Sequence, residues 1–411
     1  MTRPVRGAFG VAVLLALGLA GAPASADPRP IRIGAVQPMS GAYSALGQES
    51  EPAFEWMIRK INDEGGIRSM GGAKIEVVLA DDASNPSRTV AEARRLATQQ
   101  GAAMIVGGIL TGQMMALAPA LDELKLPALS LWAGMSRSPY VFSMGFPYER
   151  GYAQTMADFA QWLVRERGIQ LKTVALVYSN YEAGQQINRH LAEQLKAKGF
   201  TVVGEVPLDV KAQDQTAAVL RVRAMKPDLV AGLAVSRDGY LFLKARYALN
   251  YHDAVFVGGS ATFSDESMWQ ELGPEVAGSV LPRNLFPMTG FSESATAPAV
   301  QRLVKELREA KLQRNPVGMG AVQGAQAARI VQRVLEAAGS TDPQRILAAF
   351  RKVNIRPGDP DLYLLKAGGL SFNEERVLDD ARGVVVQWTP DRRQEILWPP
   401  QFATGAPRIT R

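Results

Sequence analysis

The sequence contains no cysteine and only two histidines among its 411 residues. Disulfide bonds and thiolate metal sites are therefore excluded, and the fold must be stabilised by cores that bury apolar surface. The histidines, His190 and His252, form no pattern of metal-ligand spacing with carboxylates, so we interpret both as surface residues. We expect neither a metal centre nor a cofactor.

Motifs for nucleotide binding and catalysis are missing as well. The sequence has no P-loop and no G-x-G-x-x-G fingerprint at its strand-to-helix turns. Gly318-Met319-Gly320 opens a predicted helix but follows no strand, which favours a role in helix packing. Ser136 lacks the flanking glycines of a nucleophile elbow. Nothing in the sequence argues for covalent or acid-base chemistry, so we do not expect an enzyme.

No stretch of the sequence concentrates charge of one sign. The formal net charge is +6, and basic residues are interspersed with acidic ones. A nucleic-acid or membrane-surface partner would require a basic stripe, which this sequence does not have.

Residues 1–26 have the three parts of a cleavable export signal. Arg3 and Arg6 precede an apolar run over residues 8–20, and Ala24-Ser25-Ala26 precedes Asp27. The apolar run is too short to span a bilayer, and Gly21 and Pro23 follow it, which favours cleavage over a retained anchor. We expect a cut after about Ala26 and a mature chain that works beyond the inner membrane.

Short β-branched runs alternate with amphipathic segments through most of the mature chain. Residues 31–36, 75–79, 103–106 and 127–131 read as strands, with helical periodicity between them. A second alternating set of similar size runs over residues 173–257. This βαβ series predicts an α/β fold with two doubly wound parallel sheets and a cleft between them.

The pattern changes after about residue 285. Residues 300–310, 321–338 and 343–353 are predicted to be helices, and 384–388 and 395–398 to be closing strands. Pro and Gly cluster at residues 145–147 and 282–287, which suits crossings between two lobes, although ordinary loops carry the same residues.

Two strand-to-helix turns suit a small anion. Thr111 and Gly112 lie near the start of a predicted helix, where unpaired backbone N–H groups and the helix dipole favour a carboxylate. Thr111 acting only as a helix cap is the simpler interpretation of this turn alone. A second turn over residues 130–136 follows the next strand, and both turns are expected at the ligand-binding edge of an open sheet.

An ordered set of motifs resembles the branched-chain amino acid (Leu/Ile/Val) periplasmic binding protein family, the type I substrate-binding proteins of ABC importers. The resemblance covers about residues 31–398. In order, the motifs are AVQPMSG, INDEGGI, VVLADDASNPSRTVAEARRLATQQGAAMIVGG, PALS and LVYSNYEAGQ.

The resemblance implies a type I periplasmic binding protein of two lobes, joined by three crossovers around a ligand cleft. The N-terminal lobe would take residues 27–145 and 286–380. The C-terminal lobe would take residues 146–285 and 381–411. Under this model the chain returns after residue 285 to complete the first lobe.

The resemblance also implies ligand-binding positions. Thr111 matches a hydroxyl that holds the ligand carboxylate, and Gly112 would add a backbone N–H. Ala133 and Gly134 match a second carboxylate-contacting turn, where Gly134 stands in place of a common hydroxyl residue. Further ligand contacts are expected from Tyr43, Trp132, Tyr181, Ser236, Ser260 and Phe263. Met135 and Phe286 are expected to face the cleft as well, so that these apolar and aromatic side chains would frame an apolar or aromatic acid.

One departure from the family concerns the ligand's ammonium group. The acidic residue that neutralises it in Leu/Ile/Val binders is replaced here by Ser260. Because a buried ammonium without a partner charge is unfavourable, either Glu182, Asp238 or Asp265 takes this role, or the ligand carries no ammonium.

The sequence therefore predicts a periplasmic binding protein whose lobes close around a small carboxylate, which is an amino acid or an apolar or aromatic acid. The expected partners are this ligand and the membrane subunits of an importer, with the binding protein a monomer. A ligand sensor for a signalling receptor and a secreted α/β enzyme are the alternatives.

Overall fold

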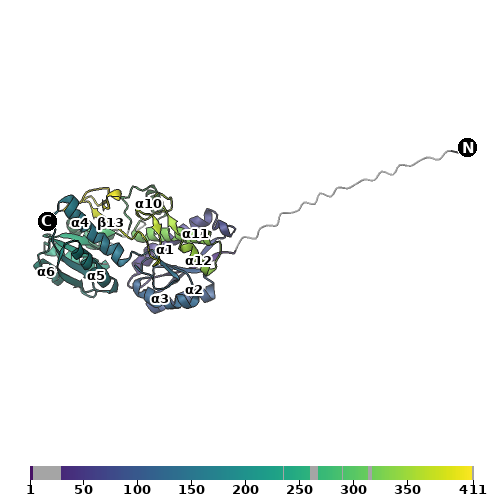
Figure 1. The fold of residues 1–411 in the computed structure, drawn as a ribbon, viewed down its shortest axis with the longest axis horizontal. Coiled ribbons are helices and arrows are strands. Elements are labelled where there is room, and N and C mark those ends of the chain that lie inside the picture. Colours follow the sequence, from purple (N-terminus) through teal and green to yellow (C-terminus); the bar gives the residue numbers. More distant parts are fainter. Residues whose placement is uncertain (3–28, 235, 260–266, 289, 313–316, 410–411) are drawn as a thin grey trace.

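The structure is a computed structural model that describes residues 1–2, 29–234, 236–259, 267–288, 290–312 and 317–409. The expected export signal and its cleavage site lie outside the described residues. Two α/β bodies lie side by side, one carrying α1, α2 and α3 and the other α4, α5 and α6 (Figure 1).

Five parallel strands form the first sheet, in the order β2-β1-β3-β4-β5. Helices cover both faces, with Phe54 and Met57 packing on one face and Leu96 and Leu117 on the other. Burial on both faces explains the near-continuous apolar runs of these strands. The elements are β1 (Ile31–Gln37), α1 (Ser44–Asp63), β2 (Ile75–Asp81), α2 (Pro86–Gln100), β3 (Met104–Gly107), α3 (Thr111–Leu124), β4 (Ala128–Ser130) and β5 (Val141–Ser143).

Seven strands form the second sheet, in the order β14-β13-β10-β9-β8-β6-β7. Strands β6 to β10 are parallel to one another, whereas β13 pairs antiparallel with both β10 and β14 at one edge. The elements are a π-helical turn (Tyr148–Ala153), α4 (Gln154–Arg167), β6 (Thr173–Ser179), α5 (Glu182–Ala197), β7 (Thr201–Leu208), α6 (Thr216–Ala224), β8 (Leu229–Gly232), α7 (Ser236–Ala248), β9 (Val255–Gly258), α8 (Ser267–Leu272), α9 (Pro274–Val280), β10 (Asn284–Met288), β13 (Val384–Trp388) and β14 (Gln394–Trp398).

The chain between β10 and β13 returns to the first sheet. It contains α10 (Pro298–Ala310), α11 (Met319–Ala338), α12 (Pro343–Phe350) and the short strands β11 (Asn354–Ile355) and β12 (Leu370–Ser371). We call the first sheet with α1, α2, α3, α11 and α12 the N-terminal lobe, and the second sheet with α4 to α9 the C-terminal lobe. The predicted α/β fold with two parallel-sheet lobes is confirmed.

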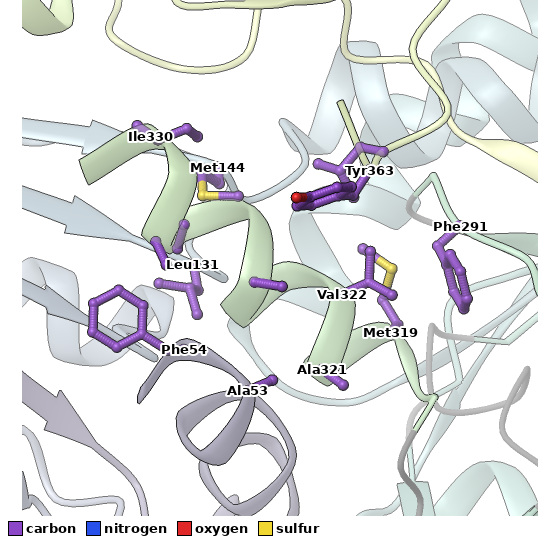
Figure 2. Packing of buried hydrophobic residues seen from close by; sticks show 14 of the residues in the cluster. Ala53, Phe54, Leu131, Met144, Phe291, Met319, Ala321, Val322, Ile330 and Tyr363 are labelled. Carbon is purple, nitrogen blue, oxygen red and sulfur yellow. The ribbon is translucent and has the colours of Figure 1, made fainter. Parts of the chain in front are cut away.

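Helices α1 and α11 pack so closely that glycine is required at their contact. A Cβ atom on Gly324 would lie 2.1 Å from the carbonyl oxygen of Ser50, and one on Gly320 would lie 2.5 Å from Cβ of Glu49. Apolar side chains of both helices and of β4 and β5 fill the space around this contact (Figure 2). The glycine-rich start of α11 therefore serves helix packing, as the sequence indicated.

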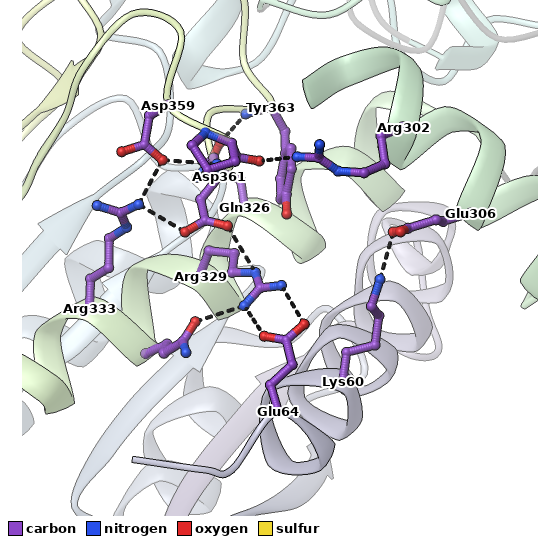
Figure 3. A network of polar contacts seen from close by, with 12 residues as sticks. Lys60, Glu64, Arg302, Glu306, Gln326, Arg329, Arg333, Asp359, Asp361 and Tyr363 are labelled. Carbon is purple, nitrogen blue, oxygen red and sulfur yellow. Dashed lines mark hydrogen bonds and ion pairs between the residues drawn. The ribbon is translucent and has the colours of Figure 1, made fainter. Parts of the chain in front are cut away.

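A polar network fixes the returning chain to α1 (Figure 3). The guanidinium group of Arg329 binds both carboxylate oxygens of Glu64, at 2.8 and 3.1 Å, and its Nε lies 3.3 Å from Asp361. Arg333 binds Asp359 and Asp361 at 2.7 and 2.8 Å. Arg329 is 8 % exposed, whereas the side chains of Glu64 and Arg333 are 45 % and 35 % exposed, so solvent screens these ion pairs in part while they tie α11 to the end of α1.

The second crossing between the lobes lies later than the sequence suggested. Residues 284–288 form β10 inside the second sheet, so the expected boundary at 285/286 falls within a strand. Phe286, which was expected to face the cleft, is fully buried in the core. Pro287 is tolerated in this strand because it has a paired neighbour on one side only. β10 pairs with β9 at Asn284 and Leu285, and with β13 over its last three residues.

Candidate ligand site between the lobes

The N-terminus of α3 presents unpaired backbone donors, as the turn over residues 105–112 predicted. The first helical hydrogen bond runs from the N–H of Met114 to the carbonyl of Leu110, at 2.7 Å. The N–H groups of Thr111, Gly112 and Gln113 precede it and have no acceptor within the helix. The helix dipole adds a partial positive charge at this end, so the site favours an anion.

The hydroxyl of Thr111 meets a side chain that the sequence did not indicate. Its Oγ1 is hydrogen-bonded to the phenol oxygen of Tyr148, and both residues are 8 % exposed. Burial raises the pKa of this phenol, and the backbone of Gly134, which lies beside it, opposes that larger effect. Three groups from separate segments, Thr111, Gly134 and Tyr148, therefore converge on one point between the lobes.

Gly134 makes this convergence possible because it has no side chain. A Cβ atom at this position would lie 2.3 Å from the carbonyl oxygen of Phe146 and 2.7 Å from Cε1 of Tyr148. The phenol ring thus occupies the space that any larger residue at 134 would fill. The turn at Gly134 therefore has no side-chain hydroxyl of its own, and the Tyr148 ring packs against it.

Ala133 supports the turn and does not offer donors to a ligand. It is fully buried, its N–H donates to Oγ of Ser130 at 3.1 Å, and its carbonyl accepts a hydrogen bond from Oγ of Ser143. Both of its backbone groups are therefore used within the lobe. Ala133 thus has no free backbone group for the ligand contact that was expected of it, whereas the expected contact at Gly134 stays a prediction.

Tyr181 immediately precedes α5, on the C-terminal lobe. Burial, followed by repulsion from Tyr152, Tyr148, Tyr43 and Asp238, raises the pKa of Tyr181 well above its ordinary value. Tyr43 immediately precedes α1 and is 42 % exposed. The ligand contacts expected from Tyr43 and Tyr181 stay predictions.

Trp132 supplies a further hydrogen-bond donor near two turns, that of Thr111 and Gly112 and that of Ala133 and Gly134, which we together call the anchor. Its ring lies 3.4 Å from the position that a Cβ atom on Gly108 would take. Its indole N–H is buried and has no hydrogen-bond partner among the described residues. A buried donor without an acceptor costs about 1–3 kcal/mol, so an acceptor on a ligand would be favoured here.

Asp238 is buried in the C-terminal lobe, at the carboxyl end of the sheet. It is 5 % exposed, and its carboxylate accepts a hydrogen bond from Oγ of Ser179, the last residue of β6. Burial raises the pKa of Asp238, and the Ser179 hydrogen bond opposes this shift. A pocket lined mainly by apolar residues and glycines, including the neighbouring Gly239, opens beside it. Asp238 is therefore not the surface residue that its polarity suggested, whereas Glu182 is exposed.

Other predicted contacts are only partly described. Ser236 begins α7 at the carboxyl end of β8, where a ligand contact was expected, but its side chain is not described. Ser260, Phe263 and Asp265 lie outside the described residues. Their predicted roles therefore stay predictions.

Comparison with known proteins matches this arrangement. Residues 30–368 match the family model described as "Periplasmic binding protein". "Leu/Ile/Val-binding protein homolog 7" of Brucella melitensis is 25% identical over 388 residues, which cover 93% of each chain.

Two solved structures share the fold. One is a solute-binding protein of an ABC transporter from Rhodopseudomonas palustris BisB5 in complex with 3,4-dihydroxybenzoic acid (TM-score 0.72, 24% identity, covering 90% of this chain and 96% of that one). The other is the branched-chain amino acid binding protein LivJ of Streptococcus pneumoniae in complex with isoleucine (TM-score 0.73, 19% identity, covering 90% and 100%).

The fold and the family match together define a non-enzymatic periplasmic binding protein. The chain belongs to the branched-chain amino acid type I periplasmic binding protein family. Members of this family are periplasmic. Among the described helices, none is long and apolar enough to cross a membrane.

Proposed function

We propose that this protein is the periplasmic solute-binding component of an ABC importer and closes around a small ligand that carries a carboxylate. The observation that carries this proposal is the convergence of Thr111, Gly134 and Tyr148 beside the N-terminus of α3. These groups offer hydroxyl and backbone N–H donors at the positive end of a helix dipole, which suits an anion of carboxylate size.

Lobe closure follows from the distribution of these groups. Thr111, Gly112 and Gly134 stand on the N-terminal lobe, whereas Tyr181 and Asp238 stand on the C-terminal lobe. A ligand held first by the N-terminal lobe gains the second set of contacts only when the lobes shut, and this difference in free energy drives closure. We propose that the mature chain, cut after about Ala26, acts as a monomer and delivers its ligand to the importer's membrane subunits.

The rest of the site suits a ligand with an apolar or aromatic body. Tyr43, Trp132 and Tyr181 present aromatic surface around the anchor, and such rings gain from stacking against another flat group. The relative with 3,4-dihydroxybenzoic acid shows that this fold accommodates an aromatic acid. An aromatic or apolar carboxylic acid is one candidate ligand class.

An amino acid is the second candidate, because Asp238 offers a buried carboxylate. Its hydrogen bond from Ser179 leaves acceptor capacity for an ammonium group. In this arrangement Asp238 takes the role that the family assigns to the acidic residue replaced by Ser260. The relatives that bear Leu/Ile/Val-binding names support this candidate.

Thermal unfolding of the purified mature chain tests the proposal. The panel would contain 3,4-dihydroxybenzoate, aliphatic acids and the standard amino acids, each compared with an uncharged alcohol of similar size. A true ligand at 100 times its dissociation constant adds about 2.7 kcal/mol to the free energy of unfolding, which raises the melting temperature by several degrees. If no carboxylate shifts the transition, or if the protein converts a ligand to product, the proposal is wrong.

A further inference from the structure

Tyr148 links the two lobes through a single side chain. Its ring belongs to the apolar cluster of the C-terminal lobe, together with Phe159, Leu163 and Ile187. Its hydroxyl reaches the N-terminal lobe, where it meets Oγ1 of Thr111 and lies beside the backbone of Gly134. The Tyr148 side chain thus spans the lobe boundary, and its hydroxyl ends at the anchor proposed for the carboxylate.

The ring is held in place by packing, so the hydroxyl has little freedom to leave the anchor. The missing Cβ of Gly134 makes room for the ring edge, which would lie 2.7 and 2.8 Å from such an atom. The backbone of the π-helical turn, which starts at Tyr148 directly after Pro147, fixes the side chain at its other end. Residue 148 is thus built into the site and is not a surface group that happens to touch it.

The hydrogen-bonding chemistry of the phenol suits a carboxylate. A phenol oxygen that accepts a hydrogen bond still has its own proton to donate. Burial raises the pKa of Tyr148, so this proton stays on the oxygen at neutral pH. In this structure Thr111 and Tyr148 pair with one another, and a carboxylate placed between them would accept a hydrogen bond from each.

We propose that Tyr148 is a ligand-binding residue whose hydroxyl donates to the ligand carboxylate and supplies the donor that the turn at Gly134 lacks. This inference rests on the proposed function, because it assigns a further residue to the same site. Since Tyr148 moves with the C-terminal lobe, its hydrogen bond forms on closure and is broken on opening. The residue therefore acts mainly on the rate at which ligand leaves.

Tyr148→Phe tests this inference, because it removes the hydroxyl and keeps the packed ring. The probes are 3,4-dihydroxybenzoate and L-isoleucine, each titrated calorimetrically into wild-type and variant, with dissociation followed by stopped-flow fluorescence. We expect the dissociation constant of the acid that binds to rise on the order of tenfold, mostly through faster dissociation. Tyr140→Phe is the matched control, since Tyr140 packs against the cores of the N-terminal lobe, and it should leave both constants unchanged.

Two different failures are distinguishable. If the wild-type protein binds neither probe and none of the wider carboxylate panel, the proposed function is wrong and this inference with it. If the wild-type protein binds an acid and Tyr148→Phe binds it equally well or more tightly, the function stands and the role of Tyr148 is wrong. A Tyr148→Phe variant that melts at the wild-type temperature excludes a loss of affinity through misfolding.

Discussion

The ammonium group of Lys366 lies 3.8 Å from the centre of the Phe146 ring, in the first segment between the lobes, and donates a hydrogen bond to the carbonyl of Arg382, in the last one, at 2.9 Å. The remaining segment meets them at Gly290, whose carbonyl accepts a hydrogen bond from the N–H of Leu365 at 2.6 Å. A Cβ atom on Gly290 would lie 3.3 Å from Phe146 and 3.7 Å from Lys366. The three crossings are therefore packed together around one buried cation.

Replacing Lys366 by Met should reveal the cost of burying this cation. Lys366 is 2 % exposed, and burial lowers its pKa to about 7 from 10.5. Below pH 7 the folded state carries the full cost of the buried charge, and the cost is relieved as pH rises from about 7 to 10.5. Denaturant titrations should show that Lys366→Met gains stability relative to wild type at pH 6, with the difference shrinking by about 1.4 kcal/mol per pH unit above pH 7. A difference independent of pH would contradict the burial of a titrating lysine.

Glu51 should give the opposite pH dependence. It is 2 % exposed, accepts a hydrogen bond from Gln37 at 2.7 Å, and burial raises its pKa to about 8 from 4.5. The folded state keeps the proton that the unfolded state releases, so stability falls by about 1.4 kcal/mol per pH unit between pH 4.5 and 8. Glu51→Gln should remove this slope and be more stable than wild type at pH 8. Glu55→Gln, on the same helix but more exposed, should keep the slope; an unchanged slope in Glu51→Gln would show that Glu51 ionises normally.

Replacement by alanine should have different effects at Gly134 and Gly112, the two glycines of the anchor. Gly134→Ala places a methyl group 2.3 Å from the carbonyl oxygen of Phe146, so we expect a loss of about 1–3 kcal/mol in the free energy of unfolding and weaker ligand binding. Gly112→Ala meets no atom within 4 Å and should leave the melting temperature unchanged or slightly raised. Weaker binding in a stable Gly112→Ala protein would place the ligand against this residue. Equal stability of the two variants would contradict the packing described at Gly134.

Asp238→Asn separates the two candidate ligand classes. The amide keeps the acceptor for Ser179 but loses the charge, so an amino acid that relies on Asp238 should bind at least about tenfold more weakly. The affinity for 3,4-dihydroxybenzoate should stay the same, because this acid has no ammonium group. Calorimetric titration of both ligands into both proteins measures the difference, with Asp253→Asn as an exposed-carboxylate control. Unchanged binding of L-isoleucine would exclude Asp238 as the ammonium partner.

The fold could be predicted from sequence because its signals are local. The strands at residues 31–36, 173–178 and 384–388 were visible as short β-branched runs, and the helices between them as periodic apolar positions. The second crossing was misplaced because Pro282 and Pro287 suggest a loop, whereas pairing of β10 on only part of each edge allows proline within a strand. That pairing depends on β13, almost a hundred residues further along the chain.

The site was predicted only where it depends on a single turn. Thr111 and Gly112 were identified because strand, glycines and helix follow one another directly. Tyr148 was missed, although its position just after Pro147 in an expected crossing was a usable signal, because its contacts with Thr111 and Gly134 arise only in the folded chain. The burial of Asp238 could not be predicted for the same reason, since Ser179, its hydrogen-bond partner, stands 59 residues before it in the chain.

The central claim is that the ligand is held by its carboxylate, and matched amides test it most directly. Calorimetric titration would compare 3,4-dihydroxybenzoate with 3,4-dihydroxybenzamide, and L-isoleucine with L-isoleucinamide. The account predicts that at least one of the acids binds and that its amide, which lacks the negative charge, binds at least about tenfold more weakly. An amide that binds as tightly as its acid would contradict the account.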